Sequence, residues 1–261
     1  GFHSLKGSFW QEQEQVETFH DVTGTYHKLK KEALPENVHI NHFIIDEQEF
    51  VGRITAIDDE FVTLLDLPKE HLMHQQAWGL KPRDIIQALA LNLLLDPNIH
   101  LVSLTGQAGS GKTIVLALKA AYLHSQNPEW NIAVTFHTRP LKGQFHQLIN
   151  TFTIEQTGEE PNWEKLRIIH AWGAPGGGDR EGIYYNFCKA NELEYFDYSG
   201  AKRKFGRGNE FDGVCQQSLG STVNDVHPMF DAILIDEAQD FPSSFLRLCY
   251  RILGSKKRLV Y

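Results

Sequence analysis

Apolar runs with few charged residues recur along the second half of the chain. They cover residues 99–104, 131–136, 166–169 and 232–235. Strands that are buried on both faces of a sheet have this composition, whereas half-exposed strands alternate between apolar and polar residues. Apolar residues at helical spacing follow the first two runs, over 112–124 and 141–152. We therefore predict an α/β fold in which a parallel sheet is flanked by helices.

The first part of the chain shows a different pattern. Residues 38–45, 50–56 and 60–65 alternate apolar with polar or β-branched positions and are separated by acidic turns. This pattern favours short antiparallel strands. We expect a small β unit over residues 36–76 with no site of its own. Residues 1–35 are polar and irregular, and we predict for them only an N-terminal lead-in of unassigned function.

We place the main domain at residues 77–261. Its first segment, residues 77–96, has the pattern of a helix that leads into the strand at 99–104. Gln87 lies on this helix, and its carboxamide can hydrogen-bond bidentately to adenine. A plain glutamine on the helix surface is the alternative.

A glycine-rich loop and a helix follow the strand at 99–104. The loop contains the full pattern G-x-x-x-x-G-K-[ST]. Glycines let backbone N–H groups approach phosphate oxygens, and the next helix directs its positive end to the same point. The lysine reaches the terminal phosphates, and the hydroxyl binds Mg²⁺. We predict a nucleoside triphosphate site formed by Gly106, Gln107, Ala108, Gly109, Ser110, Gly111, Lys112 and Thr113.

A second apolar strand, at 232–235, ends in the carboxylates Asp236 and Glu237. The carboxyl ends of parallel strands meet at one edge of a sheet, so we expect these acids beside the glycine-rich loop. We assign Mg²⁺ binding to Asp236, together with Thr113. Glu237 polarises the attacking water, and Lys112 is the catalytic lysine. The alternative for the acids is capping of the following helix.

The charge balance restricts any contact with nucleic acid to local sites. The chain has 25 Lys and Arg against 33 Asp and Glu, a net charge of −8, which argues against non-specific coating of nucleic acid. Thr138, Arg139 and His170 follow strands at the ligand edge of the sheet. An insertion near residues 173–229 interleaves aromatic residues with a basic group, which suits a single strand. A solvated, mobile loop is the alternative. The basic group is Lys202, Arg203 and Lys204.

Further features concern the cellular setting. A membrane span needs about eighteen consecutive apolar residues, and no run reaches that length, so we expect no membrane association. The three cysteines are odd in number and lack C-x-x-C spacing, and the thirteen histidines form no ligand set at metal spacing. We therefore expect neither a disulfide framework nor a zinc site, and a reducing, cytoplasmic location.

Four motifs follow one another along the main domain: GQAGSGKT at 106–113, VTFHTR at 134–139, IIHAWG at 168–173 and LIDEAQD at 234–240. They resemble the first RecA-like domain of superfamily 1 helicases of the UvrD and Rep type. The resemblance implies hydrolysis of ATP with Mg²⁺, coupled to movement along single-stranded nucleic acid, with DNA favoured over RNA. It makes Gln87 the adenine-reading residue and Gln239 the link between the nucleotide and the strand-binding loops. It also implies that Thr138, Arg139 and His170 contact single-stranded nucleic acid. It also implies a second RecA-like domain C-terminal to Tyr261, so we expect slow ATP turnover by residues 1–261 alone.

Residues 36–121 are also similar to the corresponding stretch of PhoH-like ATPases, in which a small β unit likewise precedes the glycine-rich loop. We place the helicase resemblance first, because the later motifs fit it better. A PhoH-like ATPase acting on RNA is the alternative. A third hypothesis is an ATP-responsive switch that controls a partner protein without moving a strand, and the acidic net charge modestly favours it.

Overall fold

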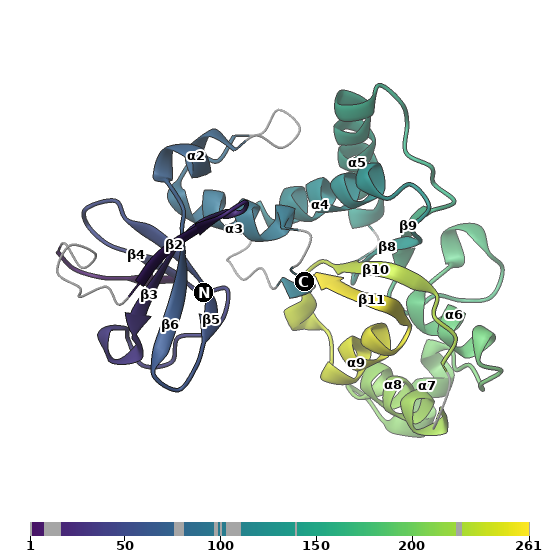
Figure 1. Cartoon of the computed structure of the whole chain (residues 1–261). Helices are drawn as coiled ribbons and strands as arrows, with labels where there is room; N and C mark the ends of the chain where they lie inside the picture. Colours follow the sequence, from purple (N-terminus) through teal and green to yellow (C-terminus); the bar gives the residue numbers. More distant parts are fainter. Residues whose placement is uncertain are drawn as a thin grey trace. The chain divides into compact units, whose positions relative to one another are not determined.

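The chain folds into two compact units, Gly1–Leu95 and Asp96–Tyr261 (Figure 1). The computed structural model describes residues 2–7, 17–75, 81–96, 99, 101–102, 111–138, 140–222 and 226–260. Of residues 101, 102 and 256–258 it describes the backbone alone. The division between the units falls after α3 (Ile85–Leu95), later than the boundary at residue 77 that the sequence pattern suggests.

Unit 1 contains a six-stranded sheet in the order β1-β4-β5-β6-β3-β2. β1 runs parallel to β4, and the other neighbours are antiparallel. The strands are β1 Phe2–Ser4, β2 Glu17–Asp21, β3 Gly24–Lys30, β4 Phe43–Ile45, β5 Val51–Ile57 and β6 Phe61–Asp66. The 3-10 helix η1 (Lys31–Ala33), α2 (Lys69–His74) and α3 complete the unit.

Both faces of this sheet are covered because neighbouring residues of a strand point to opposite sides. In β4, Phe43 packs with Leu72 of α2 and Leu89 of α3, whereas Ile44 belongs to a separate cluster on the other face. α3 is therefore held in unit 1 by its apolar side. It begins later than the predicted helix over 77–96, because the Asp84 side chain accepts a hydrogen bond from the backbone N–H of Gln87 at its first turn.

The expectation of an irregular lead-in over residues 1–35 is wrong for its described part. β2 and β3 form a hairpin, and β3 pairs with β6 in the middle of the unit. The hairpin turn is closed by the Asp21 carboxylate, which accepts hydrogen bonds from the backbone N–H groups of Thr23 and Gly24. Every residue of β2 is exposed, so the strand lacks the apolar alternation on which the prediction depends.

Unit 2 contains a five-stranded parallel sheet in the order β7-β11-β10-β8-β9. Its strands are β7 Leu101–Val102, β8 Ile132–Phe136, β9 Leu166–His170, β10 Phe230–Ile235 and β11 Leu253–Val260. Its helices are α4 Lys112–Gln126, α5 Leu141–Thr157, α6 Ile183–Ala190, α7 Tyr198–Phe205, α8 Glu210–Ser221 and α9 Ser243–Arg251, with short 3-10 helices η2 Gly178–Arg180 and η3 Ala238–Asp240. This architecture confirms the predicted α/β fold class.

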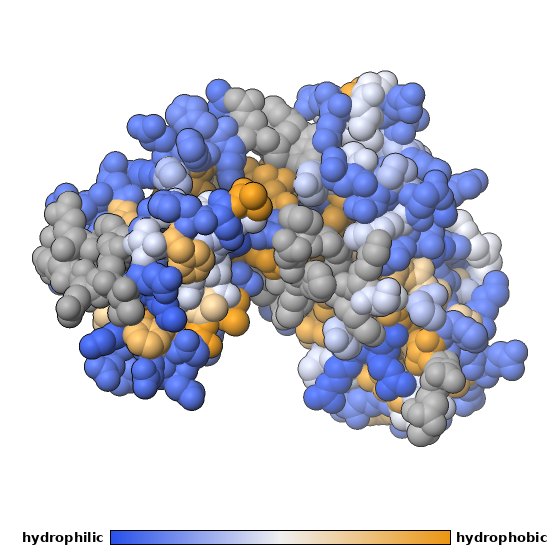
Figure 2. Space-filling view, viewed as in Figure 1, coloured by the Kyte–Doolittle hydropathy of each residue, from blue (hydrophilic) through white to orange (hydrophobic). Residues whose placement is uncertain are grey.

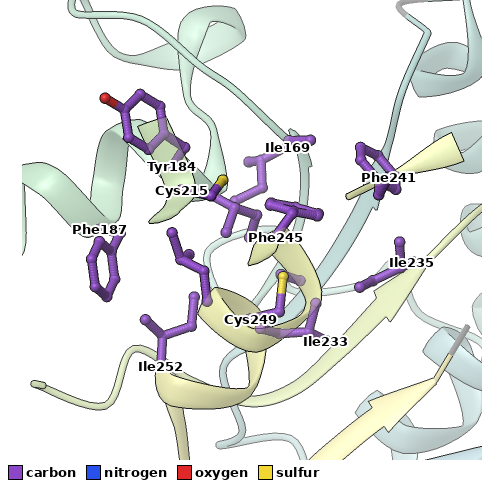
Figure 3. Close-up of a cluster of buried hydrophobic side chains, with 14 of the residues drawn as sticks. Ile169, Tyr184, Phe187, Cys215, Ile233, Ile235, Phe241, Phe245, Cys249 and Ile252 are labelled. Atoms are coloured by element: carbon purple, nitrogen blue, oxygen red, sulfur yellow. The ribbon is translucent and has the colours of Figure 1, made fainter. Parts of the chain in front are cut away.

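Helices cover both faces of the sheet in unit 2. The ring of Phe145 in α5 packs on Phe136 of β8, with 6.3 Å between centroids. Ile233 and Ile235 of β10 face the other way, into a buried cluster with α6, α8 and α9 (Figure 3). The outward sides of α2 and α5 are mainly hydrophilic in the view of Figure 2, as amphipathic surface helices require. Burial on both faces explains why β8 and β10 are so apolar in sequence.

Residues 173–222 fold into the helices α6, α7 and α8 with short connections. The alternative of a solvated, mobile loop is therefore wrong. Tyr184 and Phe187 of α6 are fully buried and belong to the core, so they do not offer rings to a ligand. The loop before α6 is fixed by a close approach of two glycine backbones, Gly173 and Gly182. Gly173 has a φ of +76°, which favours glycine. The aromatic residues of this insertion are thus mainly structural.

The three cysteines, Cys188, Cys215 and Cys249, are buried free thiols of unit 2. Burial raises the pKa of each thiol, so all three stay protonated and packed as small apolar groups. Within the described ranges, no helix is long and apolar enough to cross a membrane.

Substitution of Gly182 by alanine tests the close approach of the two glycines. A Cβ atom at Gly182 would lie 2.3 Å from the backbone nitrogen of Gly173. We predict that Gly182→Ala lowers the free energy of unfolding by about 1–3 kcal/mol, as overpacking does. Gly220→Ala in α8 is the control, because its Cβ would meet no atom of the described residues within 4 Å. Equal denaturant midpoints for the two variants would contradict the prediction.

Candidate nucleotide-binding site

The site lies where the first turn of α4 faces the end of β10. β7, which leads toward the glycine-rich loop, and β10, which carries the acids, are separated by β11 alone. Gly111 adopts a φ of +85° directly before α4, a left-handed conformation that suits glycine. Among the described residues, no atom lies within 4 Å of the position that a Cβ at Gly111 would take.

Two side-chain contacts join α4 to the end of β10. The Nζ of Lys112 donates a hydrogen bond to Oε2 of Glu237 at 3.0 Å, and the two groups form an ion pair. The Thr113 hydroxyl donates to Oδ2 of Asp236 at 3.1 Å. Residues more than a hundred positions apart in sequence therefore meet at one point, as the rule for parallel strand ends requires.

Asp236 is a buried carboxylate, with 1% of its surface exposed. Burial raises its pKa above the ordinary value, the charge of Glu237 adds to this rise, and the hydrogen bond from Thr113 opposes it. Its second oxygen, Oδ1, is buried without a hydrogen-bond partner in the described part of the chain. The protein thus holds a partly unsatisfied acid in its core, which is costly and frequently functional.

Glu237 is held in a backbone conformation that is rare for its type. Its φ is +51°, in the left-handed region, and such outliers concentrate at functional sites. Gln239 and Lys112 both donate hydrogen bonds to Oε2, and these bonds lower the pKa of Glu237. Glu237 is therefore ionised at neutral pH, and 31% of its side-chain surface is exposed, which leaves it accessible to water or a ligand.

The donor set fits a magnesium ion. Mg²⁺ prefers oxygen ligands and is usually held by one or two carboxylates, phosphate oxygens and water. Oδ1 of Asp236 offers such an oxygen, and the Thr113 hydroxyl lies at the other oxygen of the same carboxylate. A divalent cation there would offset the desolvation of the buried acid.

Several predicted residues are placed elsewhere or lie outside the described ranges. Gly106, Gln107, Ala108, Gly109 and Ser110 are outside them, and so is Arg139. Gln87 belongs to unit 1, where its side-chain oxygen accepts a hydrogen bond from the backbone N–H of Arg83. This bond and the bond from the Gln87 N–H to Asp84 together cap α3. The adenine contact of Gln87 stays a prediction.

Thr138 and His170 lie at one edge of the sheet. His170 is the last residue of β9 and pairs in register with Phe136, the last residue of β8. The two rings pack edge to face with 4.9 Å between centroids, which orients the imidazole. Thr138 follows β8 by two residues and is exposed. This edge also carries the ends of β8 and β10 side by side, because these strands are neighbours.

The basic group Lys202, Arg203 and Lys204 lies on another element, the last turn of α7. All three side chains are exposed. Lys204 lies over the ring of Phe196, 4.4 Å from its centroid, and 4.0 Å from Oε2 of Glu194, so its charge already has partners within the protein. Sequence reasoning missed a further cation, Lys142, which forms an ion pair with Asp179 near the edge of Thr138 and His170.

Comparison with known proteins gives one partial similarity. No protein-family model matches the chain. The chain is 36% identical over 87 residues to Protein PhoH2 of Bacillus subtilis (strain 168). That stretch is 33% of this chain and 20% of the Bacillus protein, so the match spans about one fifth of the relative's length. The finding supports the resemblance to PhoH-like proteins and does not bear on the resemblance to UvrD and Rep helicases.

The buried charge of Asp236 predicts a conflict between stability and ligand binding. Because burial raises its pKa, the ionised carboxylate destabilises the ligand-free fold at neutral pH, and the penalty fades as pH falls through the folded-state pKa. We predict that Asp236→Asn raises the melting temperature at pH 7, and that the gain shrinks toward acidic pH. Asp240→Asn, an exposed acid of the same segment, is the control. A lower melting temperature for Asp236→Asn at pH 7 would oppose this interpretation.

Proposed function

We propose that unit 2 binds ATP with Mg²⁺ and hydrolyses it. The observation that carries the proposal is the meeting of Lys112, Thr113, Asp236 and Glu237 at the start of α4. A cation, a hydroxyl, a buried acid and an exposed acid in this arrangement match the parts needed for phosphoryl transfer to water. The helix that begins directly after Gly111 directs its positive end to this point, which suits phosphate groups.

In the proposed reaction, ATP binding exchanges the partner of Lys112. Its ammonium leaves the Glu237 carboxylate for the terminal phosphate oxygens of ATP. A lysine ammonium forms charge-assisted hydrogen bonds with either kind of anion. Mg²⁺, when bound through Asp236 and Thr113, supplies positive charge that neutralises the phosphates. Glu237, released from the lysine and still held by Gln239, accepts a proton from water as the water oxygen attacks the γ-phosphorus. The bond to the bridging oxygen breaks, and ADP leaves with the electron pair.

We further propose that the ATPase drives movement along single-stranded nucleic acid, as the resemblance to superfamily 1 helicases implies, with DNA favoured. Support comes from Thr138 and His170 at the shared strand edge and from Gln239, which touches the proposed base. The basic residues of α7 offer phosphate contacts. The cation that stabilises the transition state is supplied in this proposal by a second RecA-like domain, so unit 2 alone turns over slowly.

A PhoH-like ATPase acting on RNA is the second candidate, and the similarity to Protein PhoH2 favours it. The two candidates differ in the strand that accelerates ATP hydrolysis. Stimulation of phosphate release by single-stranded DNA supports the helicase candidate, and stimulation by RNA alone supports the PhoH-like one. Binding of neither strand would leave an ATP-responsive switch as the function.

Glu237→Gln tests the assignment of the base. The amide keeps the shape of the side chain but cannot accept the proton, so we predict a single-turnover rate lower by roughly 10²–10⁴-fold. ATP affinity in the presence of Mg²⁺ should stay near that of the wild-type chain, because the amide makes no new charge at the phosphates. Asp240→Asn, in the same exposed turn, should hydrolyse ATP normally. Wild-type turnover by Glu237→Gln would refute the role of Glu237.

Alanine at Lys202, Arg203 and Lys204 tests the strand contact of α7. We predict weaker binding of a labelled single-stranded oligonucleotide and a shallower dependence of log Kd on log salt, by about 0.7 for each phosphate that the variant no longer binds. The control removes three basic residues of unit 1, Lys28, Lys30 and Lys31, and should change neither quantity to the same extent. Unchanged affinity in the α7 variant would remove this surface from the proposal.

A further inference from the structure

A salt bridge connects α5 to residues 171–182, the connection between β9 and α6. The Nζ of Lys142 donates to Oδ1 of Asp179 at 2.6 Å. The lysine side chain is 31% exposed and the aspartate is 95% exposed, so the pair lies at the surface. Neither residue belongs to the nucleotide-binding contacts. Lys142 nevertheless lies close to Thr138, because the N–H of Leu141 at the start of α5 donates to the carbonyl of Thr138. Nucleic acid is proposed to bind at this strand edge.

Lys142 sits at an unfavourable place for its own helix. It lies in the first turn of α5, where the helix dipole is positive, and that turn contains no acidic residue. A cation at this end destabilises a helix, whereas an anion stabilises it. The anion that offsets this charge comes from outside the helix, through the Asp179 carboxylate.

The loop that carries Asp179 is anchored at its base and built from glycines at its tip. The backbone N–H of His170 donates to the carbonyl of Glu181, and the N–H of Ala174 donates to the carbonyl of Arg180. Gly176, Gly177 and Gly178 all have positive φ values. The fixed base and the glycines let the short 3-10 helix η2, which contains Asp179, present the acid to Lys142.

The surroundings keep Asp179 negatively charged. Lys142, through its hydrogen bond and its charge, lowers the pKa of Asp179, and His170 contributes in the same direction. The carboxylate therefore lies beside the Lys142 ammonium at one strand edge, close to His170, a residue already proposed to contact nucleic acid.

We propose that Lys142 is a phosphate-contact residue for single-stranded nucleic acid, and that Asp179 occupies the place of that phosphate until a strand displaces it. The proposal rests on the nucleic-acid binding proposed above. Lysine binds phosphate as a point charge, and a carboxylate oxygen is a fair substitute for a phosphate oxygen. An exposed ion pair contributes little to stability, so a strand can replace it at small cost. In the free protein, Asp179 then lowers the affinity of this edge for single-stranded nucleic acid.

The test compares two matched neutralisations of an acid. Asp179→Asn frees Lys142, whereas Glu129→Gln frees Lys165 from a similar ion pair at the opposite ends of β8 and β9. In that control pair the lysine is 33% exposed and the glutamate 91%, close to the values of the first pair. Both substitutions change the net charge equally. The measurement is the anisotropy of a labelled oligothymidylate at several salt concentrations, with the full chain and its variants.

We expect Asp179→Asn to tighten binding more than Glu129→Gln does, by about threefold or more, with a salt slope steeper by about 0.7, the value for one phosphate on a single strand. In a Lys142→Ala background the additional gain should disappear. Equal affinities of Asp179→Asn and Glu129→Gln beside a wild-type chain that binds would overturn the inference and leave the proposed function intact. A gain that survives in Lys142→Ala would overturn it too. Absence of binding by every variant would instead overturn the nucleic-acid part of the proposed function.

Discussion

The order of strands in unit 2 is the constraint on which the site depends. β11 lies between β7 and β10, so the helix that follows β7 reaches the end of β10 across one intervening strand. The contacts Lys112–Glu237 and Thr113–Asp236 span this gap. All strands are parallel, which directs their carboxyl ends, and the side chains after them, to one edge. A different strand order would separate the same residues.

The site places two costly features next to a well-packed core. Asp236 is a buried acid with an oxygen that no described residue satisfies, and Glu237 has a left-handed backbone. Each destabilises the ligand-free fold. Directly behind them, Ile233 and Ile235 of the same strand pack with Phe241, Phe245 and the helices α6, α8 and α9 (Figure 3). Burial of these apolar side chains offsets the strain.

Sequence reasoning succeeded where burial on both faces leaves a compositional signal. The cores of β8, β9 and β10 were predictable for that reason, and the nearness of Lys112 to Glu237 followed from parallel topology. It failed where tertiary contacts decide. The strand Glu17–Asp21 is fully exposed and carries no apolar periodicity. α7 is eight residues long and basic, and it is held by the packing of Ala201 and its neighbours and not by its own propensity. The pairing of Lys142 with Asp179 requires the anchored loop before α6, which no motif encodes.

Lys112, Thr113 and Asp236 are proposed to hold one magnesium-bound triphosphate, and Glu237 to activate the water that attacks it. Calorimetric titration of the chain with ATP, once with Mg²⁺ and once with the metal chelated, tests it most directly. We predict saturable binding at a single site with Mg²⁺, a marked loss of affinity without it, and loss of binding in Lys112→Ala. Binding that is equally strong without Mg²⁺ and in Lys112→Ala, or no binding under either condition, would contradict the claim.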